Sequence, residues 1–121
     1  EQQLNSYTTD SIKFQYFFVR KTALSFAAEA YLFFPGGFGT MDELFEILTL
    51  IQTHKIRRIP VILVGSDYWN KFNQFIKDVM YKEHSTIALE DMDLYTITDK
   101  DEEIIEIIKK VPIRPMIRNK K

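Results

Sequence analysis

The sequence predicts an α/β protein built on a parallel β-sheet, because short apolar runs alternate with longer segments of helical periodicity. The runs at 30–34 and 60–65 carry no charge and have the length of strands that are buried on both faces of a sheet. A third, shorter strand is expected at 94–98. The predicted helices are 11–28, 40–53, 68–81 and a last one that opens at Asp99 or Asp101 and ends near Lys110. Parallel strands are joined by right-handed crossovers, so we expect helices on both faces of the sheet.

The first predicted helix, 11–28, is apolar around most of its circumference. Such a helix should pack against the sheet on one side and against another helix or a subunit on the other. After Gln15, its only charges are those of Arg20 and Lys21. A buried cation is costly without an anionic partner, so these side chains indicate either structural ion pairs or contact with an anionic substrate.

A glycine-rich turn at 35–43 separates the first predicted strand from the second predicted helix. Gly36, Gly37 and Gly39 allow the backbone to turn sharply and to approach a ligand without side-chain interference. Thr40 is expected to be the N-cap of the helix, whose unpaired N–H groups and positive dipole end favour an anion. In open α/β sheets of the Rossmann-like kind, ligands bind at this carboxyl edge of the strands. The sequence therefore predicts an anion-binding loop.

The same spacing also admits a purely structural interpretation. Glycine-rich turns between a strand and a helix often serve packing alone. Thr40-x-x-Glu43 matches a capping box, in which the glutamate bonds back to the N-cap amide. A catalytic role for Glu43 has to be weighed against this capping role.

Two helices indicate an oligomer. The helix 40–53, like the helix 11–28, has apolar residues on more than one side, which is wider than a single contact face requires. We therefore expect a homodimer or a higher assembly built from dimers. On the helix 68–81, Trp69 is expected in the core, and the basic tail beyond Pro112 is expected to be flexible.

Composition narrows the class of protein. With 121 residues and 45% hydrophobic content, the chain can bury one modest core, so we expect a single domain. A net charge of −1 gives no general attraction to nucleic acid or membranes, and no apolar run is long enough to cross a bilayer. The absence of cysteine is compatible with a cytoplasmic protein. His54 and His84 are isolated, so we expect no metal site.

The segment 35–43 matches the pattern P-G-G-x-G-T-x-x-E and has Arg20-Lys21 upstream, and in this it resembles the Lonely Guy (LOG) family of nucleoside 5′-monophosphate phosphoribohydrolases. The resemblance covers nearly the whole chain, includes Glu1–Asn5 and Tyr68-Trp69, and is closest to the longer bacterial branch, whose members are often labelled "lysine decarboxylase". It implies that 1–121 is a single Rossmann-like domain that lacks its N-terminal part. The implied reaction is hydrolysis of the N-glycosidic bond of AMP or a cytokinin-type riboside monophosphate to free base and ribose 5-phosphate, without a cofactor.

The resemblance also implies roles for individual residues. Such hydrolysis passes through a cationic, oxocarbenium-like ribosyl centre, which a carboxylate stabilises. Carried over position by position, the catalytic residues are Arg20 and Glu43, the phosphate loop is Gly36, Gly37, Gly39 and Thr40, and the further residues near the substrate are Lys21 and Glu46. Phe38 falls at the variable position of the motif.

Three other functions are weighed against this one. Pyridoxal phosphate chemistry needs a Schiff-base lysine with a positioned partner for the ring nitrogen, and no lysine in the sequence has such a setting. A DNA-binding module would need a basic face that the composition does not show. The stronger alternative is a non-catalytic nucleotide or molybdenum-cofactor carrier on the same fold. The pair of Arg20 and Glu43 favours the enzyme.

Overall fold

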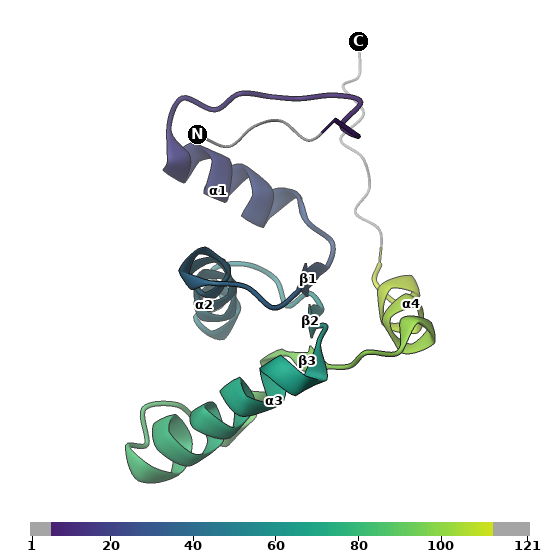
Figure 1. The fold of residues 1–121 in the computed structure, drawn as a ribbon. Helices are drawn as coiled ribbons and strands as arrows, with labels where there is room; N and C mark the ends of the chain where they lie inside the picture. The colour runs from purple at the N-terminus through teal and green to yellow at the C-terminus, as the bar shows by residue number, and fades with distance from the viewer. Residues whose placement is uncertain (1–5, 113–121) are drawn as a thin grey trace.

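A computed structural model describes residues 6–112 of the chain (Figure 1). Two expectations fall on other residues: the family resemblance at Glu1–Asn5 and the flexible basic tail after residue 112 lie outside the described part. Within it, none of the helices combines the length and apolar character that a membrane span requires.

Within residues 6–112 the sheet has three parallel strands in the order β1-β2-β3, with Leu32 opposite Ile62 and Leu63 opposite Ile97. The strands are β1 (Tyr31–Phe33), β2 (Val61–Leu63) and β3 (Thr96–Ile97). The helices are α1 (Phe17–Ala27), α2 (Phe38–Gln52), α3 (Ser66–Phe75), the π-helix η1 (Ile76–Glu83), the 3-10 helix η2 (Leu89–Leu94) and α4 (Asp101–Lys109). In Figure 1, α2 and α4 lie on opposite sides of the strands. The predicted parallel α/β architecture, a Rossmann-like fragment, is confirmed.

The core lies between α2, β2 and the start of α3. Every residue of β2 is buried, and so are Leu44, Ile47 and Ile51 on one face of α2. Trp69 of α3 is fully buried, and its indole Nε1 donates a hydrogen bond to the carbonyl of Val64 at 3.0 Å. The expectation that Trp69 belongs to the core is therefore confirmed, and its one polar group is satisfied.

The first strand is an edge strand in the described part of the chain. β1 pairs with β2 on one side only, and Leu32 is 39% exposed. The expectation of a strand buried on both faces is wrong here. An aromatic and aliphatic strand of this kind is normally covered, so its exposure marks an apolar surface.

Helix α1 begins six residues later than predicted, at Phe17 instead of Ser11. Ile12 is 82% exposed, so no tertiary packing supports a helix there, and most helices in proteins depend on such packing. Within α1, Phe18 and Leu24 are exposed and Ser25 is buried, so the expected burial of its apolar sides is also wrong in this structure. The predicted homodimer, which rests on these apolar surfaces, stays a prediction.

The helix expected at 68–81 begins at Ser66 and continues without a break into η1. Its N-cap is Gly65, with a φ of 107°, where glycine is favoured. The side chain of Asp99 is hydrogen-bonded to the first amides of this helix, so Asp99 does not open α4, which starts at Asp101.

Candidate active site

The glycine turn follows β1 at the carboxyl edge of the sheet, and helix α2 begins within it at Phe38. The N-cap is Gly37, in an extended conformation with a φ of −94°, and no side chain caps the helix. The prediction of Thr40 as the N-cap is therefore wrong, and Thr40 lies in the first turn. Glycine is itself an acceptable N-cap, so the helix can start at the earlier residue.

The three glycines of the turn differ in what they allow. A Cβ atom at Gly36 would lie 2.0 Å from the hydroxyl oxygen of Thr40, so only glycine lets the turn close over that side chain. A Cβ at Gly37 or Gly39 would meet nothing within 4 Å. Their missing side chains leave open space over the start of α2, and none of the three needs a left-handed backbone angle.

The start of α2 has the electrostatic character of an anion site. The first N–H groups of a helix have no partner inside it, and the first turn of α2 contains no acidic residue. The positive end of the helix dipole is therefore not offset by a neighbouring carboxylate of the same turn. These groups could hold a phosphate, as the sequence predicts for Gly36, Gly37, Gly39 and Thr40.

Glu43 lies one turn beyond Gly39 and Thr40, roughly 5 Å farther along the helix axis. Because the N-cap is Gly37 and not Thr40, the capping-box interpretation of Glu43 is wrong. Its carboxylate lies near the side chain of Lys21 instead, with Oε1 3.9 Å from Nζ. Glu43 is therefore not the capping partner of Thr40, which was the structural alternative to a catalytic role.

Arg20 and Glu43 line the same groove, although they come from different helices. This groove has a volume of about 340 Å³ and runs between α1 and the exposed side of β1. Tyr31 and Phe33 of the strand form part of its wall. The structure therefore brings together the two residues predicted to be catalytic.

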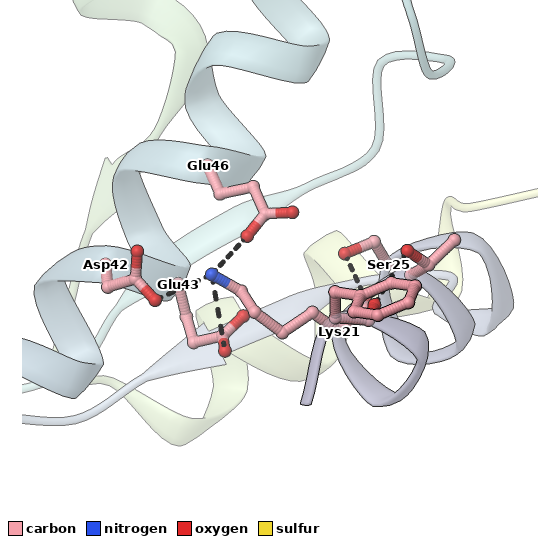
Figure 2. Close-up of polar contacts among 7 residues, drawn as sticks. Lys21, Ser25, Asp42, Glu43 and Glu46 are labelled. Atoms are coloured by element: carbon pink, nitrogen blue, oxygen red, sulfur yellow. Dashed lines mark hydrogen bonds and ion pairs between the residues drawn. The ribbon is translucent and has the colours of Figure 1, made fainter. Parts of the chain in front are cut away.

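The ammonium group of Lys21 forms ion pairs with the second and third turns of α2 (Figure 2). Its Nζ lies 2.6 Å from Asp42 Oδ2 and also forms an ion pair with Glu46. The side chain of Lys21 is only 13% exposed. The hydrogen bonds to Asp42 and Glu46 raise the pKa of Lys21 well above its ordinary value, so the amine is protonated at physiological pH.

The predicted residues Lys21, Glu43 and Glu46 thus belong to one cluster, together with Asp42. Asp42 is not among the site residues that the sequence predicts. Its spacing from Glu46 could have indicated it, because residues four apart share one face of a helix. Within residues 6–112, no group of His, Cys, Asp and Glu is arranged to hold a metal ion.

Comparison with known proteins gives a family match along most of the chain. Residues 1–108 match the family described as "Possible lysine decarboxylase". The chain is 41% identical over 58 residues to the cytokinin riboside 5′-monophosphate phosphoribohydrolase LOG7 of Arabidopsis thaliana, a match that covers 47% of this chain and 26% of that protein. It is 38% identical over 58 residues to the cytokinin riboside 5′-monophosphate phosphoribohydrolase LOG of Oryza sativa subsp. japonica, which covers 47% of this chain and 24% of the rice protein. The chain thus spans about a quarter of the length of the curated relatives that it matches.

Proposed function

This chain belongs to the LOG-type family described as possible lysine decarboxylases, and from that premise we propose that it carries active-site residues of a nucleoside 5′-monophosphate phosphoribohydrolase. The proposed reaction is hydrolysis of the N-glycosidic bond of AMP or of a cytokinin-type riboside monophosphate. Its products are the free base and ribose 5-phosphate. The curated relatives are named for such an activity on cytokinin riboside 5′-monophosphates.

The observation that carries the proposal is the common groove of Arg20 and Glu43. The groove adjoins the helix whose N-terminus follows the glycine turn, so a phosphate site and a carboxylate site lie one helical turn apart. A nucleotide 5′-phosphate bound at the helix start would place its ribose toward Glu43. The carboxylate could then stabilise the positive charge that develops on the ribosyl centre, or polarise the attacking water.

Arg20 is suited to the anionic substrate. Its guanidinium is always charged and presents a planar set of donors that matches a phosphate or a carboxylate. Because it lies on α1 while Glu43 lies on α2, it can contact the substrate from a second helix. We assign it to binding and orienting the nucleotide.

The chemistry of Lys21 argues against the decarboxylase description. A Schiff base forms from a neutral amine, and enzymes supply one by lowering the pKa of a lysine. Here the carboxylates of Asp42 and Glu46 raise the pKa of Lys21 and keep the amine charged. Lys21 is therefore a poor candidate for a pyridoxal phosphate lysine.

Substitution of Glu43 by Gln in the full-length protein tests the proposal. Glutamine keeps the size and most of the hydrogen-bonding capacity but loses the charge. Glu43→Gln should fold and bind nucleotide, yet lose roughly a hundredfold or more in turnover. The measurement is release of free base and ribose 5-phosphate from AMP.

Glu102→Gln is the matched control, because Glu102 lies exposed in the first turn of α4. It should retain the parent rate. A Glu43→Gln protein that releases base as fast as the control would contradict the catalytic role of Glu43, whereas a parent protein that binds AMP and releases no base would favour a non-catalytic nucleotide or molybdenum-cofactor carrier.

A further inference from the structure

The glycine turn receives a hydrogen bond from the neighbouring helix. The hydroxyl of Tyr68, in the first turn of α3, donates to the carbonyl oxygen of Gly36 at 2.7 Å. The two residues are 32 positions apart in the chain. The helix that follows β2 is thus tied to the turn that follows β1, at the edge of the sheet where the candidate site lies.

Tyr68 is itself held firmly. Its ring packs edge-to-face against Trp69, with ring centroids 4.9 Å apart and an interplanar angle of 83°. Trp69 is fully buried, so the tyrosine ring rests on the core. An aromatic side chain has few rotatable bonds, and a ring fixed in this way directs its hydroxyl to one place.

The beginning of α3 is anchored from the next loop. Asp99, which follows β3, accepts hydrogen bonds from the backbone N–H groups of Gly65 and Ser66 at 2.6 and 2.9 Å. It also accepts one from the Ser66 hydroxyl at 2.5 Å. Gly65 also packs closely against the glycine turn, because a Cβ atom on Gly65 would be 2.8 Å from the side chain of Pro35. The loops after all three strands are therefore connected.

The hydrogen bond to Gly36 has a consequence for the next residue. A trans peptide is planar, and its C=O and N–H bonds point in opposite directions. The carbonyl of Gly36 and the N–H of Gly37 belong to one peptide. By holding the carbonyl toward α3, Tyr68 also sets the direction of the Gly37 N–H, and Gly37 is the N-cap of α2.

We propose that Tyr68 is a positioning residue for the anion site, which aims the Gly37 amide by its hydrogen bond to Gly36. The inference rests on the proposed function in that the anion is taken to be the 5′-phosphate of the substrate. In this role Tyr68 acts through Gly36 and not by a contact of its own with the reacting atoms. Its loss should therefore weaken phosphate binding and leave the chemical step nearly unchanged.

The test is Tyr68→Phe in the full-length protein, which removes the hydroxyl and keeps the ring. Inorganic phosphate is titrated by calorimetry, and AMP hydrolysis gives kcat and KM. The dissociation constant for phosphate and the KM for AMP should each rise about three- to tenfold, the usual effect of one lost hydrogen bond. The value of kcat should stay within about twofold, because substrate that does bind reacts as before.

Tyr95→Phe is the matched control. The Tyr95 hydroxyl is also part-buried and donates a 2.7 Å hydrogen bond, but to Asn73, away from the turn. Both variants should lose similar thermal stability, while only Tyr68→Phe should bind phosphate more weakly. Equal phosphate affinity in the two variants would overturn the inference. The phosphate titration needs no turnover, so failure of the proposed reaction is distinguishable from failure of the inference.

Asp99→Asn provides a second variant that leaves Tyr68 and the turn untouched. It weakens the acceptor that anchors α3, so phosphate should bind less tightly, with a smaller change than in Tyr68→Phe. If Asp99→Asn and Tyr68→Phe both lower the melting temperature and both keep the phosphate affinity of the parent, the contact is merely structural and the proposal is wrong.

Discussion

Replacing Lys21 by Met tests the cluster that joins α1 to α2. Methionine keeps an unbranched apolar stem of similar length, so the loss is chiefly that of the charge. In Lys21→Met an uncharged side chain takes the place of the ammonium group that pairs with Asp42 and Glu46. These carboxylates and that of Glu43 then lie within about one turn of helix without the cation that offset them.

The magnitude follows from the exposure of the partners. The Lys21 side chain is 13% exposed, while those of Asp42 and Glu46 are 57% and 33% exposed. These ion pairs are intermediate in burial. An exposed ion pair stabilises the fold by about 1 kcal/mol at most, and removing one partner of a buried pair costs about 3–5 kcal/mol. With the added repulsion of acids three and four residues apart, about 0.2–0.5 kcal/mol each, the expected loss is roughly 2 kcal/mol. That corresponds to about 4–8 °C in Tm for a medium-sized domain.

The pH dependence has a definite sign. Because Asp42 and Glu46 raise the pKa of Lys21, the stabilisation is fully present below the ordinary lysine value of 10.5. It is lost only as the pH rises through the higher pKa of the folded state. The difference in Tm between the parent and Lys21→Met should therefore persist to at least pH 10 and shrink only in stronger alkali.

Thermal denaturation of the full-length protein measures this, with Lys82→Met as the control. Lys82 also pairs with an acid, Asp78 at 3.0 Å, but both side chains are about half exposed. Lys82→Met should shift Tm by no more than about 2 °C. If Lys21→Met changes Tm no more than Lys82→Met does, the cluster contributes nothing to stability and the reasoning above is refuted.

Two further predictions concern the glycine turn and Asp99, which follows β3. Gly37→Val should fold normally, because a Cβ there meets open space, yet lose phosphate binding in calorimetry, whereas Gly36→Val should lower Tm through its clash with Thr40. Wild-type affinity in Gly37→Val would remove the turn from the site. The Ser66 hydroxyl, with nearby backbone amides, lowers the pKa of Asp99 below its ordinary value of 3.8, so its stabilisation is present above that pH and is lost as the pH falls below it. Between pH 5 and pH 2 the parent should therefore lose more Tm than Asp99→Asn, and parallel curves would contradict this.

The parts of the fold that the sequence predicts well are those decided by local pattern. The uncharged run around β2 predicts a buried strand, and Trp69 at helical spacing with apolar neighbours predicts a core residue; both predictions are confirmed. The start of α1 was mispredicted because periodicity reports which residues are apolar, not whether a surface exists to cover them. The burial of Leu32 on β1 was mispredicted for the same reason.

The ends of helices were harder to predict, because several residues can cap each one. Gly37 and Thr40 both suit an N-cap, and nothing in the local sequence decides between them. For α3 the N-cap is Gly65, and its first amides donate to Asp99, which lies 33 residues after Ser66; no local pattern reveals so distant a partner. The hydrogen bond from Tyr68 to Gly36 also joins residues far apart in the chain, so no local pattern predicts it either.

The arrangement of charge along α2 gives the strongest physical support for the proposed reaction. Adjacent residues of a helix point about 100° apart, so Arg20 and Lys21 leave α1 in different directions. Lys21 turns to the acids of α2, and Arg20 lines the groove with Glu43. The two cations offset only part of the charge of Asp42, Glu43 and Glu46, so this end of the site remains negative, while the helix start one turn away is positive. A nucleotide that is breaking its glycosidic bond has the complementary distribution, with an anionic phosphate at one end and a growing positive charge on the ribosyl carbon at the other.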